Sequence, residues 1–149
     1  MTNTIFRNHY NTNDVDSTIK SCLNCDDPHL HFTAKPYEDT FKQTKYLIFS
    51  AIIDFLPAEL DQFRCHNCVF SAFYRNGFTP THFIKMPAVN SNYQTVISVR
   101  SARIRCRNCN STCSAKTSLI SSGCQISNLL KAKIATRLKS DVSAKKYCF

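Results

Sequence analysis

The sequence predicts an α+β protein with a small antiparallel sheet, a helix on its C-terminal side and a flexible N-terminus. Three observations predict this class. Short runs of β-branched and aromatic residues occupy the middle of the 149-residue chain. Two Cys-x-x-Cys pairs, Cys65/Cys68 and Cys106/Cys109, lie among these runs. Close to the C-terminus, apolar residues recur at spacings of three and four, which is the period of a helix.

The strands are expected in the middle of the chain. Residues 1–44 are polar at their start and contain several turn signals, so they are predicted as an N-terminal extension. Residues 45–53 are β-branched and aromatic, which is typical of a strand. Residues 81–86 and 93–99 alternate weakly, as half-buried strands do, and residues 87–92 would form the hairpin loop between them.

The two cysteine pairs predict a structural zinc site. Each pair brings two sulfurs onto one short arc, and a tetrahedral Zn²⁺ needs four sulfurs at about 2.3 Å. Four thiolates leave no open position for water, so the predicted role is structural rather than catalytic. The cysteines would close the ends of a small sheet, and residues 45–118 are therefore predicted as a zinc-ribbon domain. A redox Cys-x-x-Cys is the main enzymatic alternative, but it normally opens a helix after a strand, a context missing here.

The remaining cysteines are not needed for this site. The chain holds nine cysteines, and its first residues lack the basic stretch and apolar core of a secretory signal, which favours metal binding over disulfides. Cys22 and Cys25 form a third pair in an acidic neighbourhood, with no fourth pair to complete a second site. Their role stays open.

The tail predicts an amphipathic helix. Its apolar face comprises Ile126, Leu129, Leu130, Ile134 and Leu138. Either Ser127 or Ser122 could cap it. A second, shorter helix would run from Ala144 to Phe149, so residues 124–149 are interpreted as a partial helix–turn–helix.

Charge favours a polyanionic partner. The net charge is +9, but it is unevenly distributed. Residues 1–63 contain five basic and nine acidic side chains, whereas residues 64–149 contain fourteen basic side chains and one acidic one, Asp141. Such an excess indicates nucleic acid, and the alternative is a ribosome-bound or simply soluble basic domain. With one carboxylate in that half, a metal-dependent phosphoryl-transfer site cannot form there, and no apolar run is long enough to span a membrane.

Basic residues near the second cysteine pair and in the tail helix are the predicted phosphate contacts. Alternating arginines before and inside the second pair are expected to share one face of a strand, where guanidinium groups could bind phosphates. The alternative is a solvated strand edge or helix face. The candidate nucleic-acid-binding residues are Arg100, Arg103, Arg105, Arg107, Lys116, Lys131, Lys133 and Arg137.

Several stretches together resemble the N-terminal region of transposases of the ISL-three insertion-sequence family. They are residues 27–32, Cys65-His66-Asn67-Cys68, Arg75-Asn76-Gly77-Phe78, Ile104-Arg105-Cys106-Arg107-Asn108-Cys109 and residues 124–135. The chain departs from the pattern at Val69, where a small turn residue is common after a cysteine pair.

The resemblance implies a zinc-finger domain, then helix–turn–helix elements, then a DDE catalytic domain. The four cysteines match the zinc ligands by position, and nothing matches the catalytic domain, so the expectation is a truncated, non-enzymatic fragment. Such a fragment would bind the terminal inverted repeats of the element and could interact with intact transposase. Its expected location is the bacterial cytoplasm, at the nucleoid. The alternative is a zinc-ribbon accessory module that binds RNA or protein.

Overall fold

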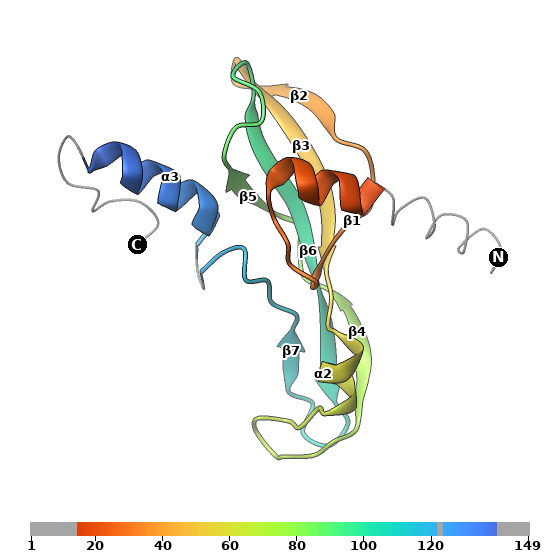
Figure 1. Ribbon diagram of the computed structural model, residues 1–149. Coiled ribbons are helices and arrows are strands. Elements are labelled where there is room, and N and C mark those ends of the chain that lie inside the picture. The colour runs from red at the N-terminus through yellow and green to blue at the C-terminus, as the bar shows by residue number, and fades with distance from the viewer. Residues whose placement is uncertain (1–14, 122–123, 140–149) are drawn as a thin grey trace.

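A single mixed sheet organises the molecule. The computed structural model describes residues 15–121 and 124–139. Seven strands form the sheet: β1 (Leu30–Phe32), β2 (Tyr37–Phe41), β3 (Thr44–Ile53), β4 (Phe73–Phe78), β5 (His82–Met86), β6 (Gln94–Cys106) and β7 (Thr112–Ser114). The short helix α2 (Pro57–Asp61) follows β3, and α3 (Asn128–Leu138) follows β7 (Figure 1). The α+β class predicted from the sequence is confirmed.

The long strand β6 is the axis on which the other strands assemble. Its first half pairs with β3 on one side and β5 on the other, and its second half pairs with β4 and β7. The predicted strand at 45–53 and the hairpin of β5 and β6 are confirmed. The prediction of an entirely antiparallel sheet is wrong, because β3 runs parallel to β6. A parallel pair needs a long crossover, and the chain between Ile53 and Gln94 supplies it with α2, β4 and β5.

Residues 15–44 are part of this fold, in contrast to the extension expected for residues 1–44. Residues 15–23 are helical, and β1 and β2 both pair with β3. Ile19 and Leu23 lie one helical turn apart, so both side chains reach the core. Leu30 and Phe32 alternate with the exposed His31 and are fully buried. Although this stretch is polar in composition, five of its residues belong to the core, because Cys25 is buried there as well. Residues 1–14 lie outside the described part of the chain.

The core covers one face of the upper half of the sheet. Phe49 and Ala51 of β3 lie beside Ile97 and Val99 of β6, and all four are buried. The helix at 15–23 and Leu129 of α3 pack against this cluster. We call this side of the sheet the covered face.

The buried side of β6 changes at Ser101 and Ala102, which are both buried. Beyond this point the buried residues are Ala102, Ile104 and Cys106, which project from the other face because side chains alternate along a strand. The lower half of β6, with β4 and β7, forms a narrow three-stranded antiparallel sheet that leads to the cysteine loops (Figure 1).

The tail helix begins as the sequence predicts. Ser127 is the N-cap of α3, and its hydroxyl oxygen accepts a hydrogen bond from the amide of Leu130 at 3.1 Å. Two backbone hydrogen bonds join Lys85 of β5 to Gln125 and Ser127, which fixes the start of the helix at the edge of the sheet. The predicted second helix at 144–149 lies outside the described residues. Among those that are described, no helix is long and apolar enough to cross a membrane.

His29 joins the turn before β1 to helix α2. Its Nδ1 lies 3.0 Å from Asp27 Oδ1 and its Nε2 lies 2.9 Å from Glu59 Oε1. Both contacts are hydrogen bonds to carboxylates when the ring is doubly protonated. Burial lowers the pKa of His29, but the hydrogen bonds to Asp27 and Glu59 outweigh burial, and the pKa is raised above 6.5.

We expect a corresponding pH dependence of stability. Because the folded-state pKa is raised, the contribution of His29 is fully present below the unfolded-state pKa and is lost as the pH rises through the folded-state value. The urea midpoint of the protein should therefore fall over this interval. The His29→Gln variant should lack this decrease, and an equal decrease in both proteins would exclude His29 as its source.

Candidate metal centre

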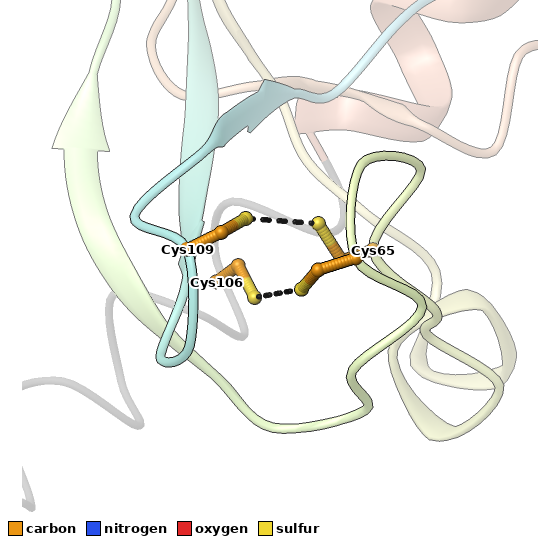
Figure 2. A group of neighbouring side chains, drawn as sticks. Cys65, Cys106 and Cys109 are labelled. Atoms are coloured by element: carbon orange, nitrogen blue, oxygen red, sulfur yellow. Dashed lines mark hydrogen bonds between the residues drawn. The ribbon is translucent and has the colours of Figure 1, made fainter.

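The four predicted ligands come together in space. The sulfurs of Cys65, Cys68, Cys106 and Cys109 all lie within 4.8 Å of one another, and this group could hold a metal ion. Cys65 Sγ lies 3.5 Å from Cys109 Sγ, and Cys68 Sγ lies 3.5 Å from Cys106 Sγ. A tetrahedral ion at about 2.3 Å from each sulfur requires sulfurs roughly 3.8 Å apart, so the spacing fits. Figure 2 shows Cys65 of one loop facing Cys106 and Cys109 of the other.

The two cysteine loops have the same backbone hydrogen bonds. In the first, the Cys65 amide donates to Phe70 O and the Val69 amide donates to Cys65 O, at 2.9 and 2.8 Å. In the second, the Cys106 amide donates to Ser111 O and the Asn110 amide donates to Cys106 O, at 2.9 and 3.1 Å.

Each loop also directs a backbone amide at its first sulfur. The Asn67 amide donates to Cys65 Sγ and the Asn108 amide to Cys106 Sγ, both at 3.4 Å. Such bonds stabilise thiolates, the form that binds a metal ion. The two loops thus present their cysteines in the same way.

The last cysteine of each loop is contacted by the opposite loop. Hydrogen bonds from the Ser111 side chain and amide, together with one from the Asn67 side chain, lower the pKa of Cys109 to about 5. The Asn108 side chain lowers the pKa of Cys68. Asn67 and Asn108 occupy the same position in their loops, so each asparagine supports the last sulfur of the other loop. Sequence reasoning missed this pair, although the shared Asn in Cys-His-Asn-Cys and Cys-Arg-Asn-Cys was the available signal.

Val69 is the strained position of the first loop. Its φ of 64° lies in the left-handed region, where Asn110 of the second loop also lies with φ 63°. Asparagine tolerates this conformation, whereas a β-branched residue does so only under strain. Val69 is 71% exposed, so no packing compensates for that strain.

We therefore expect Val69→Asn to stabilise the protein by about 1 kcal/mol, because it relieves the left-handed strain. The shift would be measured as an increase in the denaturant midpoint of the metal-loaded protein. Val89→Asn is the matched control, since Val89 is also exposed but is not among the residues with positive φ. Equal changes in the two variants would contradict the strain argument.

The other cysteine pair does not join the cluster. Cys22 is exposed, and Cys25 is buried in the core beside Leu23. Burial raises the pKa of Cys25 to about 11, which opposes the thiolate form. His66, inside the first loop, is exposed.

The four arginines do not share one face of β6. Arg103 and Arg105 are two residues apart and project from the same side. Arg100 projects from the opposite side, where its guanidinium lies 4.9 Å from the ring centroid of Phe78. Arg107 follows the strand, and its guanidinium lies 5.2 Å from the ring centroid of Tyr74. Tyr74 pairs with Arg105, so Arg107 returns to the side of Arg103 and Arg105.

The remaining predicted basic residues lie apart from this group. Lys116 is exposed in the segment after β7. Lys131, Lys133 and Arg137 belong to α3, which lies at the far end of the sheet from the cysteine loops (Figure 1). Lys131 Nζ donates to Ser121 Oγ at 3.1 Å, which holds it against the preceding loop. The predicted basic residues therefore do not form one continuous surface.

Comparison with models of protein families, with curated proteins and with solved structures finds no match to this chain.

Proposed function

We propose that this chain is a zinc-dependent nucleic-acid-binding module, the DNA-binding region of an insertion-sequence transposase. The observation that carries the proposal is the position of the cysteine cluster at the end of the strand that bears Arg103 and Arg105. A structural ion at this point would fix the loop that contains Arg107 as well. The three guanidinium groups would then form a rigid cationic surface, which we call the arginine surface.

The surroundings of the arginine surface support a polyanionic ligand. The Nε atoms of Arg103 and Arg105 are buried without a hydrogen-bond partner within the described residues. The ion pairs of that part of the chain involve Lys20, His29 and Arg75 instead. Unneutralised guanidinium groups on one side of a narrow sheet favour phosphate, which accepts two hydrogen bonds from each.

Removing two of these charges should weaken nucleic-acid binding. We expect Arg103→Ala/Arg105→Ala to reduce affinity for duplex DNA by about tenfold or more and to lower the slope of log affinity against log salt by about 1 to 2. Fluorescence anisotropy across a salt series measures both. Lys35→Ala/Lys45→Ala removes the same charge from exposed positions in the N-terminal half and should have a smaller effect. Identical losses would assign the effect to net charge rather than to the arginine surface.

Recognition of transposon ends is tested separately. A duplex carrying the terminal inverted repeat of the element should bind more tightly than a duplex of the same composition in scrambled order. Equal affinity for the two duplexes would contradict recognition of transposon ends and would indicate DNA binding without sequence preference.

One observation favours a second candidate, a zinc-ribbon accessory module that binds protein. Val69 and Phe70 are exposed apolar neighbours in the first cysteine loop. A protein partner that binds this loop would show a shallow salt dependence, whereas phosphate contacts give a steep one.

A further inference from the structure

The upper half of the sheet has a second face that none of the described helices covers. The helix at 15–23 and α3 pack with the core cluster on the covered face. Ile48 of β3 and Val96 of β6 are register partners that lie outside this cluster, on the other side. We call that side the open face.

The exposed aromatic residues of the strands all project from the open face. Tyr37 is the register partner of Ile48, Phe41 of Thr44, and Phe83 of Ser98. Phe78 of β4 pairs with Ala102, on the side from which Arg100 projects. These four rings are between 40% and 62% exposed, far more than aromatic side chains in a packed core.

Cations accompany two of the rings. Lys42 Nζ lies 5.4 Å from the centroid of the Phe41 ring, and the Arg100 guanidinium lies 4.9 Å from that of Phe78. Lys85, the partner of Val96, is exposed on the same face. The open face therefore alternates flat rings with positive charges.

We propose that the open face binds single-stranded nucleic acid. Unpaired bases stack on exposed aromatic rings, while neighbouring cations contact the phosphates between them. The chemistry requires unstacked bases, because a duplex keeps its base faces inside the helix. The ligand is therefore a single strand of DNA or RNA.

The distribution of side chains disfavours a protein on this face. Ser50 and Ser98 form a polar row across β3 and β6, and Thr44 and Gln94 lie among the rings. Ile48 and Val96 are already buried by their neighbours, so the exposed apolar surface is divided into separate rings. A protein interface core is continuous and poor in charge.

A second copy of this chain is disfavoured by charge. A symmetric pair of open faces would bring Lys85 and Arg100 of one copy close to the same residues of the other. Asp39, the partner of Tyr46, is the acidic side chain that the strand register places on this face. Because one carboxylate cannot neutralise several cations, two open faces would repel each other. A phosphate backbone would neutralise the excess positive charge.

This site is independent of the proposed function. In β6, Arg100 projects from the open face, whereas Arg103 and Arg105 project from the opposite side. The open face therefore needs neither the arginine surface nor a bound metal ion at the cysteines.

The test uses the full chain, with a fluorescent thymidine oligomer, a uridine oligomer and a duplex as probes. Tyr37→Ala/Phe83→Ala removes two half-exposed rings, so the thermal midpoint should stay close to that of the wild type. Each lost ring should weaken binding of the single strands by about fivefold or more and leave the duplex unaffected. Tyr37→Phe/Phe83→Tyr keeps both rings and should bind like the wild type. Phe70→Ala, which removes an exposed ring from the first cysteine loop, is the matched control.

The outcomes separate the alternatives. Loss of single-strand binding in the alanine variant, with rescue by the conservative variant, supports the proposal, and the two oligomers distinguish DNA from RNA. Unchanged affinity for both oligomers overturns it. Sedimentation that shows a wild-type dimer and a monomeric alanine variant also overturns it, because the rings then bind a second copy. Arg103→Ala/Arg105→Ala tests the proposed function with the duplex, so either assignment can fail while the other stands.

Discussion

In the zinc-bound protein that we propose, replacement of Cys106 by serine should release the ion and unfold the lower half of the sheet. Cys106 is 1% exposed, ends β6 and places its sulfur 3.5 Å from that of Cys68. Serine lacks the soft thiolate that Zn²⁺ prefers, and three remaining ligands hold the ion far less tightly. Structural zinc contributes on the order of 10 kcal/mol to the folding of small zinc domains, so the expected effect exceeds that of any ordinary core substitution.

Two measurements check this expectation. Metal analysis of the purified protein should give one zinc per wild-type chain and much less than one for Cys106→Ser. Circular dichroism and hydrogen exchange should show loss of protection in β4 and β7, with protection kept in β3. Cys113→Ser is the matched control, since Cys113 lies in β7, close to the loops, but outside the cluster. If Cys106→Ser retains one zinc per chain, Cys106 is not a ligand.

Local patterns were sufficient to predict the cluster of four cysteines. The Cys-x-x-Cys spacing fixes how two sulfurs meet on one loop, and the strands between the pairs predicted that the loops would lie at the ends of a small sheet. The capping of α3 by Ser127 depends on residues within one helical turn, so it could be predicted from the sequence as well. Each of these features is encoded by neighbours in the chain.

Features that depend on distant partners could not be predicted. The parallel pairing of β3 with β6 depends on how the intervening segment crosses over, which neither strand encodes. The error over Arg100 is of another kind: it was expected beside Arg103, but a spacing of three places the two on opposite faces of any strand, which the sequence alone could have shown. The change of buried side at Ser101 and Ala102 depends on what covers each half of the sheet.

Asp27 links the N-terminal part of the fold to the segment after β7. Its carboxylate is 3% exposed and accepts hydrogen bonds from the Thr117 hydroxyl, the Ser118 amide and the His29 amide. Burial raises the pKa of Asp27, but these hydrogen bonds outweigh burial, led by that from Thr117, and the pKa lies below its ordinary value of 3.8. Residues 90 positions apart in the chain are joined through this one side chain.

We expect Asp27→Ala to destabilise the protein by about 3 kcal/mol, because it leaves buried donors without an acceptor. Asp26→Ala is the matched control: Asp26 is exposed, and its loss should change stability by less than about 0.5 kcal/mol.

Since the folded-state pKa of Asp27 is lowered, its contribution to stability is present above the unfolded-state pKa and is lost as the pH falls through the folded-state value. Urea unfolding at neutral pH and in this acidic range measures the free energy of unfolding of both proteins. The wild type should be more stable than Asp27→Ala at neutral pH, and this difference in free energy should shrink as the pH falls. A difference that stays constant would mean that the ionised carboxylate is not what stabilises this part of the fold.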